Sequence, residues 1–250
     1  SRCSFILCSS AKFGTSLTSG ITKAGIAGIF GIKKLIIFDC DGTLVASEHL
    51  YNSITAELLN ELGYQEYTPE LCMELFAGQS WSTIRHIIED RHQEKLPADL
   101  IERYINIAEK RMHHNFDPCP NAENVLHNFH TEHKICVASN GERGNVIKSL
   151  EVTNLKKYFI DDHIFTKIQV ERPKPAPDLF IFALEQMNHR ANDSVIIEDS
   201  VTGVSAAKAA NIKVLGYIGS AHDKDKQSEK LKQAGANIII ECLTDIENHI

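Results

Sequence analysis

Short apolar segments that alternate with helical stretches constrain the fold of this chain more than any other feature. Residues 35–38 (LIIF) form such a segment, rich in β-branched and aromatic side chains, as in a strand buried on both faces. Because strands that alternate with helices build right-handed βαβ units, the pattern predicts an α/β protein with a parallel sheet. The predicted strands are residues 35–38, 134–138, 163–165, 194–197, 214–218 and 238–240.

One long stretch interrupts this alternation. Residues 47–115 contain helical patterns and no strand candidate, which predicts a small helical subdomain inserted into the α/β core. We therefore divide this part of the chain into a core of residues 35–46 and 116–250 and an inserted four-helix cap of residues 47–115. The predicted cap helices are residues 47–62, 69–76, 81–88 and 97–108.

The first 34 residues differ in composition from the rest. They hold five basic residues, no acidic ones, and many Ser, Thr and Gly residues. We expect a disordered leader and leave it out of the fold; an organellar transit peptide is the alternative, although arginine is scarce for one.

Charge and cysteine usage narrow the partners and the compartment. The 33 Asp and Glu residues outnumber the 26 Lys and Arg residues, which argues against a nucleic-acid partner. No apolar stretch approaches the roughly 18 residues of a membrane span. The seven cysteines are scattered without a CxxC pair, which favours reduced thiols over disulfides or zinc. We expect a cytoplasmic protein with no membrane partner, a monomer or weak homodimer.

Polar side chains follow three of the predicted strands at the point where each strand ends. Asp39 and Asp41 follow the first strand, Ser139 and Asn140 the second, and Glu198 with Asp199 the fourth. In parallel sheets ligands bind beyond the carboxyl ends of the strands, so these groups are predicted to meet in one crevice. Facing carboxylates repel unless a cation lies between them, and oxygen ligands without His or Cys favour Mg²⁺.

Such a crevice suits phosphoryl transfer. One carboxylate can act as a nucleophile and form an aspartyl-phosphate, while its neighbour protonates the leaving oxygen and later deprotonates water. Lys174 and the Ser139 hydroxyl are candidates for neutralising the phosphoryl oxygens. Taken singly, each of these motifs also has an ordinary explanation as a turn, a loop or a helix cap.

Four motifs in order carry a family resemblance. They are residues 39–44 (DCDGTL), 137–141 (VASNG), 174–178 (KPAPD) and 196–200 (IIEDS). Together they resemble the haloacid dehalogenase superfamily, in the branch with a helical cap after the first motif. The resemblance spans about residues 35–218 and implies a Rossmann-like core.

The resemblance also implies roles for the acidic residues. Asp39 would be the nucleophile and a metal ligand, and Asp41 the general acid and base, with its backbone carbonyl on Mg²⁺. Asp199, with Glu198 nearby, would complete the metal site. The cap would close over the substrate and exclude water.

Further residues are expected to bind the substrate. Ser139, Asn140 and Lys174 are predicted to bind the phosphate. Gly78 and Gln79 in the cap, and Arg143 shortly after the second motif, are candidates for contacts with the rest of the substrate.

Within the family, the residues favour a phosphatase. Dehalogenases typically lack the second Asp of the first motif, whereas Asp41 is present here. Mutases of the β-phosphoglucomutase type typically carry a Lys-Gly-x-x-Arg stretch and a His in the cap, where this chain has residues 77–81 (AGQSW) and Tyr51. In place of the usual acid, Ala46 follows the first motif, which weakens the inference of activity.

We therefore predict a Mg²⁺-dependent phosphatase that hydrolyses a small phosphorylated metabolite, a sugar or sugar-acid phosphate, through an aspartyl-phosphate. The alternatives are a β-phosphoglucomutase-like sugar-phosphate mutase and a non-catalytic binding module.

Overall fold

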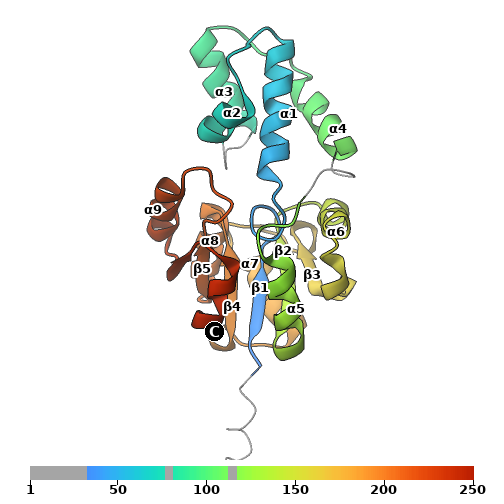
Figure 1. Ribbon diagram of the computed structural model, residues 1–250, viewed down its shortest axis with the longest axis vertical. Coiled ribbons are helices and arrows are strands. Elements are labelled where there is room, and N and C mark those ends of the chain that lie inside the picture. Colours follow the sequence, from blue (N-terminus) through green and yellow to red (C-terminus); the bar gives the residue numbers. More distant parts are fainter. Residues whose placement is uncertain (1–32, 77–80, 112–116) are drawn as a thin grey trace, which may run out of the picture. The chain divides into compact units, whose positions relative to one another are not determined.

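The computed structural model describes residues 33–76, 81–111 and 117–250, and residues 33–250 form one compact unit. In the described chain a parallel sheet has the strand order β3-β2-β1-β4-β5-β6. From β1 the chain builds outwards to β3, returns beside β1 as β4, and builds outwards again to β6 (Figure 1). The strands are β1 Leu35–Phe38, β2 Lys134–Ser139, β3 Ile164–Thr166, β4 Ser194–Glu198, β5 Lys213–Tyr217 and β6 Ile238–Ile240.

The register places the carboxyl ends of the central strands at one level. Phe38 of β1 pairs with Val137 of β2 on one side and with Ile197 of β4 on the other. The residues that follow these positions therefore emerge at the same edge. Because the strand order reverses at β1, this edge is also the place where a ligand crevice forms in such sheets.

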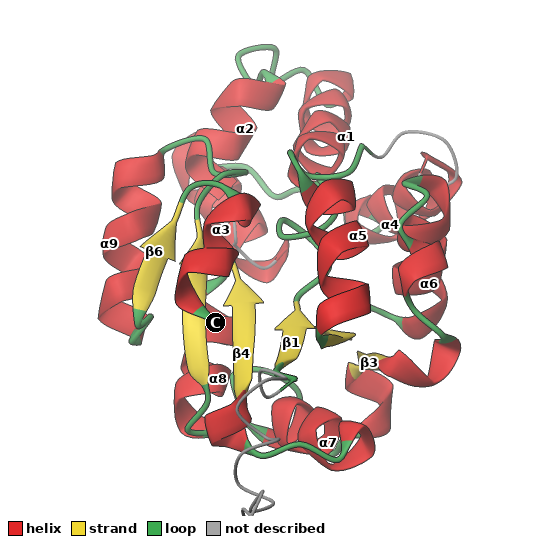
Figure 2. Cartoon of the chain, turned by 60° about the horizontal axis from the view of Figure 1, so that its bottom comes forward, coloured by secondary structure: helices red, strands yellow, loops and turns green. Residues whose placement is uncertain are grey.

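Helices cover both faces of the sheet (Figure 2). Ile36 and Phe38 pack into one core cluster, and Leu35 and Ile37 into the other, because successive side chains of a strand point to opposite faces. This two-sided burial explains why β1 is an unbroken apolar run. The first face carries α5 Ala122–Glu132, α6 Arg143–Val152 and the 3₁₀ segment η5 Leu243–His249; the second carries α7 Asp178–Met187, α8 Val201–Ala209 and α9 Lys224–Ala234.

A helical insertion separates β1 from α5, as the sequence predicts. Helix α1 packs against α2 and α4 (Figure 1). Two ion pairs also join α4 to α1: Arg103 with Glu61, and Arg111 with Glu57 at 2.7 Å. The inserted helices are α1 Glu48–Glu61, α2 Pro69–Phe76, α3 Trp81–His92 and α4 Leu100–Arg111.

The α/β class with a helical insertion is confirmed, and the differences are at element ends. Strand β3 begins one residue later than predicted because His163 belongs to a 3₁₀ turn. Helix α8 begins at Val201, and Ser200 caps it by accepting a hydrogen bond from the Gly203 N–H. Short 3₁₀ turns cover Lys156–Tyr158, Asp161–His163, Lys167–Gln169 and Ala191–Asp193.

Two predictions, on membrane spans and on disulfides, can be compared with the structure. Among the described residues, no helix is long and apolar enough to cross a membrane. The cysteines in this part of the chain are free thiols: Cys40, Cys72, Cys119, Cys136 and Cys242.

Candidate active site

The site is built around Asp39, the first residue after β1. Its backbone N–H donates to the Ile197 carbonyl at 3.0 Å, so the β1–β4 ladder continues to this residue. The side chain is 8% exposed at the carboxyl edge of the sheet. The strand therefore fixes the direction of this carboxylate before any ligand binds.

Lys174 lies between two carboxylates. Its Nζ donates to Asp39 Oδ1 at 2.7 Å and to Glu198 Oε1 at 2.5 Å. The ammonium also lies over the Phe180 ring, 4.8 Å from its centroid. The side chain is buried, so the loop that carries Lys174 supplies a desolvated cation to the ends of β1 and β4.

The charges of Lys174 and the nearby carboxylates change the pKa values of Lys174 and Asp39. Burial works to lower the pKa of Lys174, but Asp39 and Glu198 more than offset it and raise the pKa above its ordinary value. Burial raises the pKa of Asp39, Lys174 opposes that rise, and Glu198 and Asp41 add to it. Lys174 therefore stays positively charged, while Asp39 lacks enough positive charge around it.

Glu198 is fully buried and engaged at both oxygens. Oε1 accepts from Lys174, and Oε2 accepts from the Ser200 N–H at 3.0 Å and the Ser200 hydroxyl at 2.8 Å. A Cβ on Gly203 would lie 1.7 Å from Oε1, so only glycine leaves room for this carboxylate. Glu198 thus joins the lysine loop to the start of α8.

Asp199 lies close to the loop that follows β1. Thr43 Oγ1 donates to Asp199 Oδ1 at 3.0 Å. Gly42 has a φ of +82°, and a Cβ there would lie 2.1 Å from Asp199 Oδ2. Both the backbone conformation and the close approach require glycine at this position.

Asp39, Glu198 and Asp199 form a candidate metal centre. One oxygen from each lies within 4.8 Å of the others. The donor set is all oxygen, which fits Mg²⁺, and a divalent cation would supply the missing positive charge beside Asp39. Because both Glu198 oxygens already accept hydrogen bonds, Asp39 and Asp199 are the better direct ligands.

Asp41 lies close to the second motif and to the start of the cap. A Cβ on Gly141 would be 3.7 Å from Asp41 Oδ2, which puts this carboxylate near the loop after β2. Burial raises the pKa of Asp41, and the Ser47 side chain and Lys174 oppose the rise. A raised pKa helps a carboxyl group keep a proton, as a general acid must.

The second motif contributes two differently engaged side chains. Ser139 is buried, and its Oγ accepts from the Gly141 N–H at 3.0 Å. Asn140 donates through Nδ2 to the Lys174 carbonyl at 2.9 Å and accepts from the Lys174 N–H at 3.0 Å. The Asn140 side chain therefore holds the backbone of the lysine loop.

Arg143 contacts the backbone around the start of β3. Its guanidinium donates to the carbonyl of Asp161 at 2.8 Å and to that of Ile164. It anchors the start of α6 to these residues, and the substrate contact expected of it stays a prediction. The other two predicted substrate residues, Gly78 and Gln79, lie outside the described residues.

Two residues without a sequence motif hold the loops of the site in place. The Ser220 hydroxyl donates to the Gly42 carbonyl at 2.6 Å, and Gln227 Nε2 of α9 donates to the Asp199 carbonyl at 2.5 Å. Both come from the segment after β5, which carries no motif. The sequence could have indicated them only through topology, because β5 neighbours β4 and the segment after β5 therefore lies beside the loop of Asp199.

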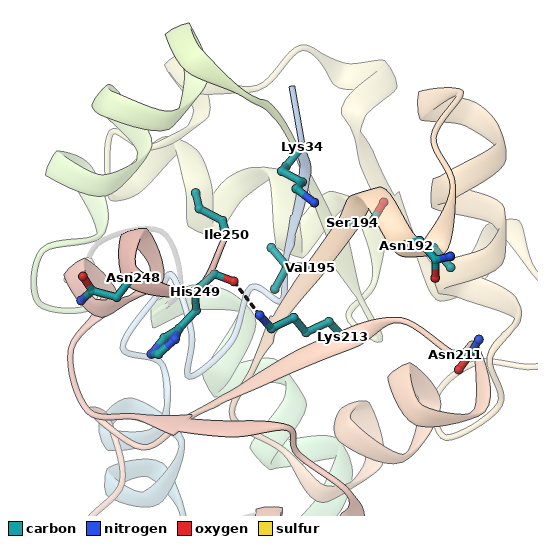
Figure 3. A pocket seen from close by; sticks show the side chains of 10 residues that line it. Lys34, Asn192, Ser194, Val195, Asn211, Lys213, Asn248, His249 and Ile250 are labelled. Atoms are coloured by element: carbon teal, nitrogen blue, oxygen red, sulfur yellow. Dashed lines mark hydrogen bonds between the residues drawn. The ribbon is translucent and has the colours of Figure 1, made fainter. Parts of the chain in front are cut away.

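A cavity of about 540 Å³ lies elsewhere, at the amino ends of β4 and β5 (Figure 3). Lys213 lines it and donates to the His249 carbonyl at 2.7 Å. None of the carboxylates described above lines this cavity. It lies at the opposite edge of the sheet from Asp39.

Comparison with known proteins identifies the class. Residues 36–217 match the model of the haloacid dehalogenase-like hydrolases, which covers most of the chain. The protein therefore belongs to this family, as its four motifs suggested.

Individual relatives agree with this assignment. The chain is 27% identical over 191 residues to 6-phosphogluconate phosphatase of Escherichia coli K12, covering 76% of this chain and 85% of that protein. It is 26% identical over 177 residues to fructose-1-phosphate phosphatase of the same strain, covering 71% and 92%. A haloacid dehalogenase-like protein of unknown function from Agrobacterium tumefaciens superimposes with a TM-score of 0.78 at 30% identity, covering 86% and 96%.

Proposed function

We propose that this protein is a Mg²⁺-dependent phosphatase that hydrolyses a small sugar or sugar-acid phosphate through an aspartyl-phosphate. The observation that carries the proposal is the arrangement around Asp39. Its carboxylate stands at the end of β1, is paired with buried Lys174, and lies within a cluster of oxygen ligands. The relatives named as sugar-phosphate phosphatases support the same reaction class.

The first step transfers the phosphoryl group to the protein. An Asp39 oxygen attacks phosphorus, a bond forms between them, and the bond from phosphorus to the leaving oxygen breaks. Asp41 gives its proton to that leaving oxygen, so the alcohol departs neutral. When bound between Asp39 and Asp199, Mg²⁺ would supply positive charge to the phosphoryl oxygens.

The second step returns the protein to its starting state. Asp41, now ionised, accepts a proton from water, and the water oxygen attacks phosphorus. The bond from phosphorus to Asp39 breaks and inorganic phosphate leaves. Lys174 and Ser139 would hold the phosphoryl oxygens through both steps, with Asn140 fixing the backbone of Lys174.

The test is phosphate release across a panel of phosphorylated sugars, sugar acids and phosphoglycolate, with Mg²⁺ or with EDTA. We expect release that needs Mg²⁺ and is absent in the Asp39→Asn variant. No release from any compound, with interconversion of β-glucose 1-phosphate instead, would replace the phosphatase by a mutase. Binding of Mg²⁺ and substrates without any turnover would indicate a non-catalytic module.

The cellular compartment is part of the same proposal. We propose a cytoplasmic enzyme, in keeping with the free thiols of the described chain. Fractionation of cells that produce the full chain tests this, and recovery in an organelle fraction would contradict it.

A further inference from the structure

Three aromatic side chains of the cap form one connected group. The rings of Tyr51 on α1 and Tyr104 on α4 have centroids 6.3 Å apart. The Trp81 ring at the start of α3 meets Tyr104 edge-on at 4.6 Å. All three residues are only half-buried. We call Tyr51, Trp81 and Tyr104 the aromatic platform.

The aromatic platform begins beside the acid and base of the active site. Ser47 immediately precedes α1, and its N–H donates at 2.9 Å to the carbonyl of Val45, a residue that forms a β-bridge with Asp41. Tyr51 follows Ser47 by four residues, and its N–H donates to the Ser47 carbonyl at 3.2 Å, so the two side chains lie on one face. The charge of Asp41 also reaches the phenols. Burial raises the pKa of Tyr104 to about 12, with a smaller contribution from Asp41, and burial with Asp41 raises that of Tyr51.

The arginines of the described cap already have partners. Arg85 donates to Glu89 at 2.9 Å and to the Pro97 carbonyl at 2.6 Å. Arg103 and Arg111 pair with α1 carboxylates. Arg91 lies over the Tyr67 ring, 5.8 Å from its centroid.

The two lysines of the described cap do not supply a cation to the platform either. Lys95 pairs with Glu89 at 2.7 Å. Lys110 is exposed on α4 and lies six residues from Tyr104, off the helix face that carries Tyr104, Ile107 and Arg111. No Lys or Arg occurs between residues 111 and 134 or at residues 77–80. Arg111 shares the α4 face of Tyr104, but its guanidinium is paired with Glu57. In the described cap, the platform therefore has no unpaired Lys or Arg on its own helix faces.

Such a surface selects for a particular kind of leaving group. Aromatic faces pack well against the C–H face of a sugar ring. A carboxylate or a second phosphate on the substrate would have to compete there with the carboxylates that already pair with the cap arginines, so its desolvation would be poorly compensated. The packing on aromatic faces and the cost of burying a charge both concern the organic part of the substrate, beyond the transferred phosphate.

Given the phosphatase activity proposed above, we infer that the aromatic platform selects monophosphates whose organic part is a cyclic, uncharged sugar. Open-chain sugar-acid phosphates and bisphosphates are the poorer substrates. This narrows the substrate class, and it separates this chain from its 6-phosphogluconate phosphatase relative in preference.

The test compares ring and ringless substrates on the wild-type protein. Glucose 6-phosphate, fructose 1-phosphate and ribose 5-phosphate are the ring set, 6-phosphogluconate and phosphoglycolate the ringless acids, and acetyl phosphate a probe too small for the platform. The best ring substrate should exceed both acids in kcat/KM by about tenfold or more. Equal values, or a preference for either acid, would overturn the inference.

Variants assign that preference to the platform. Trp81→Leu and Tyr104→Leu should each lower kcat/KM about three- to tenfold for the ring set, mainly through KM, and leave acetyl phosphate unchanged. Trp81→Phe and Tyr104→Phe should retain most of the preference. Tyr64→Leu is the matched control, because Tyr64 packs on His92 instead, 4.3 Å between centroids. Equal losses on acetyl phosphate would mean that the platform only supports the fold.

A binding measurement keeps this test separate from that of the phosphatase. Titration calorimetry of glucose 6-phosphate and 6-phosphogluconate into the Asp39→Asn variant needs no turnover. Tighter binding of glucose 6-phosphate, lost in the double variant with Trp81→Leu, supports the platform even if acetyl phosphate is not hydrolysed. Tighter binding of 6-phosphogluconate overturns it even if the phosphatase is real.

Discussion

At the scale of single residues, the site depends on one buried cation shared by two carboxylates. Lys174 contacts Asp39 and Glu198 and is itself desolvated. Removing one member of such a group leaves the others buried without compensation, which costs more than the pair itself contributes.

Lys174→Met should therefore reduce stability as well as activity. Without Mg²⁺, we expect the free energy of unfolding to fall by about 3–5 kcal/mol, because the buried Asp39 and Glu198 side chains lose the ammonium that they share. Urea denaturation measures this, with exposed Lys232→Met as the control. An unfolding free energy equal to that of the control would show that the two carboxylates do not need Lys174.

A second prediction at this scale concerns the close approach at Gly203. The methyl group of Gly203→Ala would lie 1.7 Å from Glu198 Oε1, so Glu198 must move away from Lys174 and Ser200. We expect a loss of about 1–3 kcal/mol of stability and of most phosphate release. Gly144→Ala, where a Cβ meets nothing within 4 Å, is the matched control and should be neutral. Similar behaviour of the two variants would contradict the packing described here.

At the scale of elements, the segment from β5 into α9 holds in place the two loops beside the candidate metal centre. Ser220 bonds to the Gly42 carbonyl and Gln227 to the Asp199 carbonyl. Neither side chain belongs to the candidate ligand cluster, so each can act on the site only by positioning a loop.

Gln227→Ala should weaken Mg²⁺ binding while leaving the fold intact. We expect the Mg²⁺ concentration for half-maximal activity to rise about tenfold, with a smaller change in kcat at saturating Mg²⁺, because the loop carrying Asp199 loses one anchor. Calorimetric Mg²⁺ titration gives a readout without turnover. Exposed Gln233→Ala on the same helix is the control, and an unchanged Mg²⁺ affinity in Gln227→Ala would refute the positioning role.

Contacts between Glu89 of α3 and the segment that leads to α4 make the stability of the cap depend on pH. Glu89 accepts from Lys95, Arg85 and the Leu96 N–H. Lys95 and Arg85 hold its pKa down to about 2. A carboxylate with a depressed pKa stabilises the fold above its unfolded pKa, and this contribution is lost as the pH falls towards the folded value.

Glu89→Gln should therefore destabilise the cap most at neutral pH. The difference in unfolding free energy between wild type and variant should be constant above about pH 5 and shrink between about pH 4.5 and 2. Urea denaturation at pH 7, 5 and 3.5 tests this, with exposed Glu102→Gln as the control. A difference that grows on acidification would reverse the assigned sign.

At the scale of the whole molecule, the topology explains why so much was predictable. Parallel strands buried on both faces read as near-continuous apolar runs, so β1 and the three central residues of β4 (VII) stood out in the sequence. Their carboxyl ends meet at the point where the strand order reverses, so Asp39 and Asp199 were predicted to be close. Local chemistry and global topology agree at those positions.

What the sequence did not reveal depends on contacts between distant segments. Phosphate binding by Asn140 stays a prediction, but nothing in the sequence indicated that its side chain holds the Lys174 backbone, 34 positions along the chain. Arg143 contacts the carbonyl of Ile164 in β3, and Gln227 contacts the carbonyl of Asp199 from α9. A polar side chain carries no local signal of its partner, so only the assembled fold distinguishes a ligand from an anchor.

The central claim is that Asp39 becomes phosphorylated during turnover. Borohydride quenching of the protein with Mg²⁺ and its best substrate, followed by peptide mass spectrometry, tests this directly, because reduction of an aspartyl-phosphate yields homoserine. We expect homoserine at position 39 only, dependent on Mg²⁺, and neither homoserine nor phosphate release in Asp39→Asn. Phosphate release with an unmodified Asp39, or turnover by the Asp39→Asn variant, would contradict it.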